Sequence, residues 1–245
     1  MREGSRFHNI AFTHAFQAIV DTSESKVSSY EALIRGSNNE SAGHVFSQVR
    51  PDDMVWFDQV SREKALLTAA RLGIDCAINL NFFPSSVLFN NGTLLERTVQ
   101  TAMDLGIGAE RLVVELTEAE LVRDTEPLRA ILNNFRRKKV VIAIDDFGAG
   151  YSGLNMLAEI HPDIIKIDMA LVRDIHKRGA RQSIVHAIHS VCLDLGIRVI
   201  AEGVETVAEF DFLRSIGISL FQGHLFGKPS FESLSAVHFP TFPAT

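Results

Sequence analysis

Two adjacent carboxylates end a stretch that otherwise has the composition of a buried strand. The apolar residues 140–144 run directly into Asp145 and Asp146, and Gly148 and Gly150 follow in the sequence FGAG. An unpaired carboxylate is costly to bury, and two carboxylates side by side repel each other. A bound cation would neutralise both charges, and the glycines would let the loop turn close to it. We therefore expect a metal site at this stretch.

Polar residues also lie near the ends of other strand-like runs. Every run after the first contributes at least one: Glu31, Asn79, Glu115, Asp145 with Asp146, Lys166 with Asp168, Glu202 and Gln222. In a barrel of parallel strands, the carboxyl ends meet on one face, where active sites lie. A single acidic residue in such a place is often a helix cap or a salt-bridge partner. Seven strand ends together indicate one shared site.

The types of these residues favour hard divalent cations. Carboxylate and amide oxygens suit Mg²⁺ or Mn²⁺ better than zinc. Five oxygen donors could hold two ions, with Asp145 or Asp146 bridging them: Glu31, Asn79, Glu115, Asp145 and Asp146. Two such ions can generate a hydroxide and stabilise an in-line displacement at phosphorus. Lys166 could bind the attacking water or a phosphate oxygen, or it could simply balance buried charge.

Eight short strand-like runs are available to position these side chains. They occupy residues 16–21, 28–34, 76–82, 112–118, 140–147, 164–168, 198–204 and 220–223. Segments with helical apolar spacing separate most of the later runs. In residues 183–195, for example, Ile184, Ile188, Val191 and Leu195 share one apolar face, and Gly196 follows as a stop.

This alternation predicts an α/β fold, a modified (β/α)₈ barrel. The first connection departs from the regular pattern, because only the sequence TSESKV separates the first two runs. Six residues are too few for a crossover helix. The first strand is therefore expected to be antiparallel to the second.

Composition restricts the classes of function. The chain has 245 residues, of which 46% are hydrophobic and 22% charged, as in ordinary globular proteins. This length allows one large domain or two small ones. The net charge of −6 argues against general binding to the phosphate backbone of DNA or RNA. Cys76 and Cys192 form no zinc-binding pattern and are expected to be reduced thiols. No signal-peptide core or bilayer-length apolar run is present, so we expect a cytoplasmic chain without a membrane segment.

The motifs and their order resemble those of EAL domains. They are YEALIRG, INLN, ELTE, DDFGAGYSGL, DIIKID, AEGVET and QGHLFGKP, and the similarity extends from Gln17 to Pro229. One tripeptide occurs often by chance, whereas seven ordered motifs are specific. The resemblance implies a bacterial signalling enzyme that hydrolyses cyclic di-GMP to linear pGpG with two Mg²⁺ or Mn²⁺ ions. It also implies a single EAL domain over residues 1–245 with a core at about 12–235. A homodimer and control by a regulatory domain or protein are further implications.

The resemblance further implies a role for each matching residue. The metal ligands would be Glu31, Asn79, Glu115, Asp145 and Asp146, with Glu202 and Asp168 ligating or supporting the metal centre. The catalytic residues would be Lys166, which would hold the nucleophilic water, together with Glu202 and Asp146. The substrate contacts would be Gln17, Arg35 and Gln222. Glu118 would order the loop DFGAGYSG.

Three positions depart from the family pattern without removing a proposed ligand. Ala149 stands where a threonine is usual, Ala18 where a proline is common, and Asn81 where the motif has serine. The segment of residues 35–53 also departs and is expected to form one wall of the dinucleotide pocket. Two alternatives stay open: a non-catalytic cyclic di-GMP receptor or interaction module, and a different metal-dependent barrel phosphodiesterase, such as one for glycerophosphodiesters.

Overall fold

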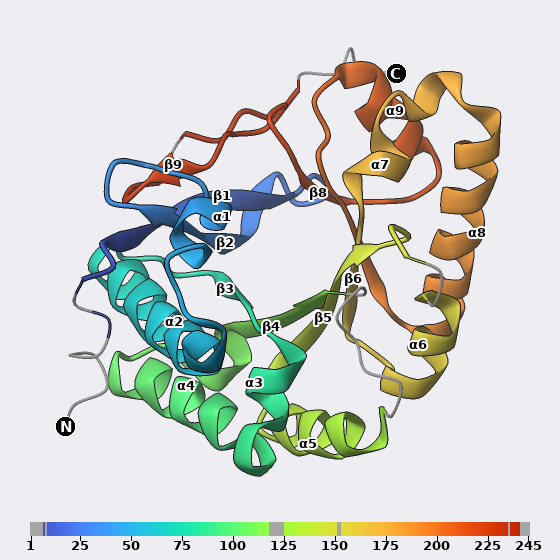
Figure 1. The fold of residues 1–245 in the computed structure, drawn as a ribbon. Coiled ribbons are helices and arrows are strands. Elements are labelled where there is room, and N and C mark those ends of the chain that lie inside the picture. Colours follow the sequence, from blue (N-terminus) through green and yellow to red (C-terminus); the bar gives the residue numbers. More distant parts are fainter. Residues whose placement is uncertain (1–6, 8, 118–124, 151–152, 235, 241–245) are drawn as a thin grey trace.

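The strands of the chain close into a barrel (Figure 1). The computed structural model describes residues 7, 9–117, 125–150, 153–234 and 236–240. Within them one sheet of nine strands runs β2–β3–β4–β5–β6–β7–β8–β1–β9, and β1 also pairs with β2, which closes the circle. The strands are β1 (Phe12–Asp21), β2 (Lys26–Gly36), β3 (Ala77–Asn81), β4 (Leu112–Thr117), β5 (Val141–Phe147), β6 (Ile164–Ile167), β7 (Arg198–Ala201), β8 (Leu220–Gln222) and β9 (Ser230–Phe231). The predicted eight-stranded barrel is confirmed.

The first strand is antiparallel to both of its barrel neighbours. Phe12 of β1 pairs with Gly36 of β2, and Ile19 pairs with Gln222 of β8. The pairs from β2 to β8 are all parallel. Only residues 22–25 connect β1 to β2, so the predicted hairpin is confirmed. The two-residue strand β9 pairs with β1 and was not predicted.

Helices cover the outside of the barrel (Figure 1). They are α1 (Ala42–Phe46), α2 (Met54–Arg71), α3 (Pro84–Leu88), α4 (Thr93–Asp104), α5 (Glu126–Arg137), α6 (Gly153–Ile160), α7 (Met169–Val172), α8 (Gly179–Leu195) and α9 (Val207–Ser215). The main core lies between strands and helices, which is why the parallel strands are apolar on both faces. None of the described helices is both long enough and apolar enough to cross a membrane.

A second apolar layer fills the inside of the barrel. Its residues are Ile19, Val113, Ala143, Ile164, Ile200 and Leu220. Side chains two positions apart on a strand point to the same face, so the next inward-facing residue of each strand lies directly above this layer. The layer is therefore the floor on which an inward-facing polar site can rest.

Helix α8 forms as predicted, but a different face is buried. It ends at Gly196, which has a left-handed φ of 71°. The residues that face the barrel are Val185, Ile188, His189 and Cys192. Ile184, Val191 and Leu195 are 49%, 38% and 46% exposed, so the predicted apolar face was wrong except at Ile188. The sequence contains two overlapping stripes with helical spacing, and packing against the barrel selects one of them.

Candidate active site

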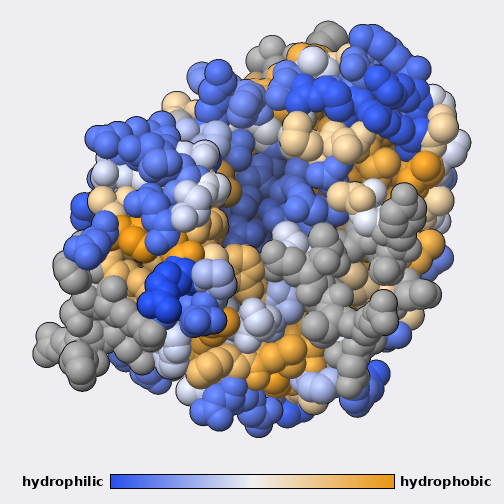
Figure 2. Space-filling view, viewed as in Figure 1, coloured by the Kyte–Doolittle hydropathy of each residue, from blue (hydrophilic) through white to orange (hydrophobic). Residues whose placement is uncertain are grey.

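The polar residues predicted at the strand ends lie directly above the apolar floor. Glu115, Asp145, Lys166, Glu202 and Gln222 each follow a floor residue by two positions. In the antiparallel β1 the order is reversed, and Gln17 precedes Ile19 by two. Figure 2 shows a hydrophilic hollow at the centre of this face, over the mouth of the barrel. The two-residue period of the strands thus brings side chains from distant parts of the sequence into one site.

Lys166 lies at the centre of four carboxylates. Its Nζ atom is 3.2 Å from Glu31 Oε2, 3.0 Å from Glu115 Oε1, 3.1 Å from Asp145 Oδ1 and 2.8 Å from Glu202 Oε1. The Lys166 side chain is fully buried. One ammonium therefore balances acids from β2, β4, β5 and the end of β7.

The pKa values of these groups report an excess of negative charge. Burial alone would lower the pKa of Lys166, but the surrounding carboxylates outweigh burial and raise it well above its usual value. Burial raises the pKa values of Glu115 and Glu202 well above those of ordinary carboxyls, and neighbouring carboxylates add to the rise. Burial also disfavours the charge on Glu31, yet Lys166 and hydrogen bonds from two side-chain amides lower its pKa. An added cation would relieve this repulsion.

Asn79 and Glu115 each have a buried side-chain oxygen without a hydrogen-bond partner among the described residues. The Asn79 amide donates from Nδ2 to Glu115 Oε1 at 2.7 Å, which leaves Asn79 Oδ1 and Glu115 Oε2 unsatisfied. Such buried acceptors are rare unless an ion or water completes them. Their chemistry fits a hard cation, because both are oxygen donors beside a carboxylate cluster.

The carboxylates form two groups that share one member. Glu31, Glu115 and Asp145 each offer an oxygen within 4.8 Å of the others, and so do Asp145, Asp146 and Glu202. Asp145 belongs to both groups. The arrangement therefore supports divalent metal binding at the barrel mouth, with Asp145 between two adjacent groups of oxygen ligands.

Asp146 adopts a backbone conformation that is unusual for aspartate. Its φ is +53°, and its N–H donates to Asp145 Oδ1 at 3.0 Å. Burial, with Asp145 and Asp168 nearby, raises the pKa of Asp146 to about 6. Gly148 follows with a φ of 96°, and an added Cβ there would lie 2.5 Å from Leu171. The turn at the end of β5 thus depends on left-handed residues, which lets both carboxylates approach the site.

The remaining predicted site residues have defined places. Gln222 Nε2 donates to Glu31 Oε2 at 2.7 Å and lies 3.2 Å from Gln17 Oε1. Asp168 caps α7 by accepting from Ala170 N at 2.8 Å, so the structure brings it beside the site as a helix cap. Glu118 lies outside the described residues, so the loop-ordering prediction stays untested.

Two cavities open on either side of the carboxylates, and Glu31, Asp145 and Asp146 line both. One, of about 410 Å³, is lined mostly by polar and charged residues and reaches Gln17, His224 and Glu205. The other, of about 300 Å³, extends from Arg35 towards α1 and α2. Ala42 and Phe46, from the segment of residues 35–53, lie in its wall.

Some residues in or beside the site were given no role from the sequence. Asn81 donates from Nδ2 to Glu31 Oε1 at 3.1 Å and so helps to fix this carboxylate. Its place two residues after Asn79 on the same face was the available signal. Glu205 forms a two-bond ion pair with Arg173 and lies 3.8 Å from His224 Nδ1. His14, Asp58 and Arg62 line the smaller cavity, and no sequence pattern marks them.

Comparison with known families agrees with this geometry. The family model of the EAL domain matches residues 4–229, and the chain belongs to this family. The blue light- and temperature-regulated antirepressor BluF of Escherichia coli is 30% identical over 92% of this chain and 56% of its own length. The cyclic di-GMP phosphodiesterase PdeR of Escherichia coli is 38% identical over 64% of this chain and 23% of its own length. The chain thus spans about half of BluF and a quarter of PdeR.

Solved structures share the whole fold. A standalone EAL protein of Vibrio cholerae with bound c-di-GMP matches with a TM-score of 0.88 and 42% identity, over 94% of this chain and 97% of that one. A manganese and cyclic di-GMP complex of Klebsiella pneumoniae BlrP1 matches with a TM-score of 0.86 and 39% identity, over 90% of this chain and 56% of that one. The modified barrel is therefore the fold of EAL proteins.

Proposed function

We propose that this EAL domain hydrolyses cyclic di-GMP to linear pGpG with two Mg²⁺ or Mn²⁺ ions. The observation that carries the proposal is the pair of carboxylate groups that share Asp145 at the barrel mouth. Two adjacent oxygen sites are the arrangement used for in-line displacement at phosphorus. The names of PdeR and of the manganese complex of BlrP1 support the choice of substrate and metal.

Each residue has a part in the proposed reaction. The cation ligands would be Glu31, Asn79, Glu115, Asp145 and Asp146, with Glu202 and Asp168 ligating or supporting the centre. When bound, the cations would neutralise phosphate charge and lower the pKa of a water molecule. Lys166 Nζ would hold that water for attack on phosphorus, and the 3′ oxygen would depart. Arg35 would bind a phosphate oxygen, while Gln17 and Gln222 would contact the nucleotide.

The proposal is tested by incubating the protein with cyclic di-GMP in Mg²⁺, in Mn²⁺ and in chelator. We expect pGpG, separated by chromatography, only in the presence of metal. Substrate that stays intact in all three conditions would refute the proposed hydrolysis.

A receptor without turnover is the second candidate. One relative that covers most of this chain, BluF, is named an antirepressor and not an enzyme. Tight binding of cyclic di-GMP without pGpG would favour this function. All predicted ligands are present at the barrel mouth here, which favours the enzyme. Membership of the EAL family weighs against a glycerophosphodiesterase.

Other properties stay predictions from the sequence. They are a single domain over residues 1–245, a homodimer, a cytoplasmic location and control by a regulatory domain or protein. Sedimentation velocity with and without cyclic di-GMP tests the homodimer directly.

A further inference from the structure

Side-chain amides hold both carboxylate oxygens of Glu31. Gln222 Nε2 donates to Oε2 at 2.7 Å, and Asn81 Nδ2 donates to Oε1 at 3.1 Å. Lys166 Nζ also donates to Oε2, at 3.2 Å. Glu31 is 5% exposed, so these donors, and not bulk water, fix the direction in which its oxygens point.

The two amides that hold Glu31 are supported differently. Gln222 Nε2 also donates to Gln17 Oε1 at 3.2 Å, and Gln17 Nε2 donates to the carbonyl oxygen of Gly227 at 3.1 Å. Both glutamines are buried, so the amide on this side is fixed by a chain of hydrogen bonds that ends on the backbone. On the other side, Asn81 is exposed at the barrel mouth. A substitution of Asn81 can therefore release one oxygen of Glu31 without disturbing the buried chain.

Asn81 can reach Glu31 because of its place on β3. It is the last residue of this strand and lies two positions after Asn79, so both side chains share the inward face. Asn79 is the register partner of Glu31 in the parallel pairing of β3 with β2. Asn81 thus lies diagonally across from Glu31, one step nearer the mouth. An asparagine amide extends over this diagonal, whereas a serine hydroxyl ends one bond closer to the backbone.

The two oxygens of Glu31 differ in their remaining acceptor capacity. A carboxylate oxygen can accept about two hydrogen bonds. Among the hydrogen bonds of the described residues, Oε2 accepts two, from Gln222 and Lys166, whereas Oε1 accepts one, from Asn81. Glu31 also belongs to one of the two carboxylate groups that could hold a cation. Oε1 is therefore the oxygen with capacity left for a cation, and it is the one that Asn81 orients.

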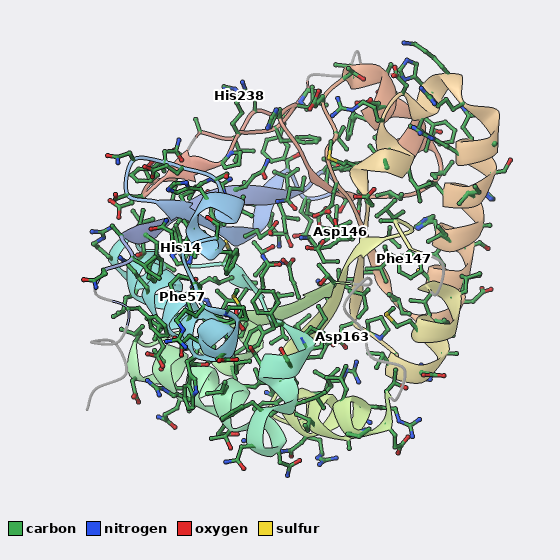
Figure 3. All side chains as sticks on the ribbon, viewed as in Figure 1. His14, Phe57, Asp146, Phe147, Asp163 and His238 are labelled. Atoms are coloured by element: carbon green, nitrogen blue, oxygen red, sulfur yellow. The ribbon has the colours of Figure 1, made fainter. Side chains whose placement is uncertain are left out.

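A direct contact between Asn81 and the substrate is the alternative role for this side chain. Asn81 lines the smaller cavity. That cavity extends from Asp146, near the centre of this face in Figure 3, to His14, on the side of β1 and α2. Metal binding measured without substrate separates the two roles, because a contact to the substrate cannot change it.

We propose that Asn81 is a positioning residue that sets the affinity of the metal centre by fixing the direction of Glu31 Oε1. Hydrogen-bond partners orient metal ligands, and their loss typically costs about 10- to 100-fold in metal affinity or activity. The EAL motif has serine at this position, so this chain carries a donor that the usual motif does not supply. The inference rests on the proposed function, since it assumes that divalent cations bind at the carboxylates.

The test compares Asn81→Ser and Asn81→Leu with the control Gln100→Ser. Serine is the residue of the family motif, and leucine has nearly the shape of asparagine without its donor. Gln100 Nε2 donates to Asp104 Oδ1 at 2.7 Å on the exposed side of α4, so its replacement removes a similar bond outside the carboxylate groups. Calorimetry on the metal-free protein without substrate measures the dissociation constant for Mn²⁺. Formation of pGpG is then followed at limiting and at saturating Mn²⁺.

We expect the dissociation constant for Mn²⁺ to rise about tenfold in both Asn81 variants, because a hydrogen bond to a charged group is lost. Hydrolysis at limiting Mn²⁺ should fall by the same factor. Saturating Mn²⁺ should restore kcat to within about threefold of wild type, and KM for cyclic di-GMP should then stay within about twofold. Gln100→Ser should change none of these quantities.

The proposal is overturned if the Asn81 variants bind Mn²⁺ with wild-type affinity. A raised KM that persists at saturating Mn²⁺, with unchanged affinity for Mn²⁺, would also overturn it and would identify Asn81 as a substrate contact. Failure of the proposed function has a different signature, in which no pGpG forms at any metal concentration although the Asn81 variants still lose affinity for Mn²⁺. If Asn81→Leu does not fold, Asn81→Ala removes the donor without adding apolar bulk, and urea denaturation in chelator verifies that its stability matches wild type.

Discussion

The ammonium group of Lys166 contacts four carboxylates at once. Replacing Lys166 should therefore lower the rate of hydrolysis much more than the affinity for the substrate. We expect Lys166→Met to lower kcat by about 10² to 10³, because a positioned donor to the reacting groups is lost. The dissociation constant for cyclic di-GMP should change less than threefold. Calorimetry and pGpG formation in Mn²⁺ measure the two quantities. Equal losses in both would show that Lys166 acts in binding.

Asp146 should make metal binding depend on pH. Its pKa is raised to about 6, so the metal-free protein holds a proton on this carboxyl below pH 6, and a metal ligand must lose it. The affinity for Mn²⁺ should therefore fall by about tenfold per pH unit below 6 on account of this group. Asp146→Asn should make the dependence shallower by about one proton. Calorimetric titrations from pH 5 to 8 measure the slope, and identical slopes would contradict the assignment.

The raised pKa of Asp146 also determines how the stability of the metal-free protein depends on pH. A carboxyl whose folded pKa is raised binds more protons in the folded state than in the unfolded state. Without metal, its contribution to stability is therefore complete below pH 4 and is lost as the pH rises through about 6. A bound cation would reverse this loss by favouring the ionised carboxylate.

At the scale of elements, the two sides of α8 should respond differently to the same change. Val185 is fully buried and Ile184 is 49% exposed, although they are neighbours in sequence. We expect Val185→Ala to reduce the free energy of unfolding by about 2 kcal/mol, since it leaves a cavity. Ile184→Ala should change it by about 0.5 kcal/mol or less. Urea denaturation of both variants checks this, and similar losses would mean that a partner covers Ile184.

The strands could be predicted because each carries a strong local signal. A β-rich apolar run that ends in a polar residue identifies both the strand and its place in the site, as for Ile164 and Lys166. The hairpin followed from a connection too short for a helix. The buried face of α8 could not be predicted from the sequence, because two stripes of apolar residues have the same helical spacing. Only contact with the barrel distinguishes the two stripes.

The residues that line the smaller cavity beside α2 could not be predicted from the sequence, because their burial depends on contacts with distant segments. Asp58 and Arg62 are four residues apart, which is the spacing of an ordinary surface pair on a helix. Their burial depends on Phe82 of a distant segment and on the closure of the barrel. The carboxylates at the barrel mouth could be predicted without these contacts, since the two-residue period of the strands determines which side chains point inward.

For the molecule as a whole, metal should raise thermal stability. A ligand at 100 times its dissociation constant stabilises the folded state by about 2.7 kcal/mol. For a domain of this size, that corresponds to a rise in Tm of about 5 to 10 °C. Differential scanning fluorimetry in Mn²⁺ and in chelator measures the rise. Asp145→Asn, which alters the member shared by both carboxylate groups, should abolish most of it.

The reversed first strand also decides on which side of the barrel the polypeptide arrives. In a regular barrel, the opening strand begins at the floor and runs up to the mouth. Here Phe12 pairs with Gly36 at the mouth, and Asp21 pairs with Lys26 at the floor. Any domain joined ahead of Phe12 would thus be tethered beside the substrate opening, within reach of α1 and α2. A single antiparallel strand would bring such an attachment to the mouth of the barrel without a long linker.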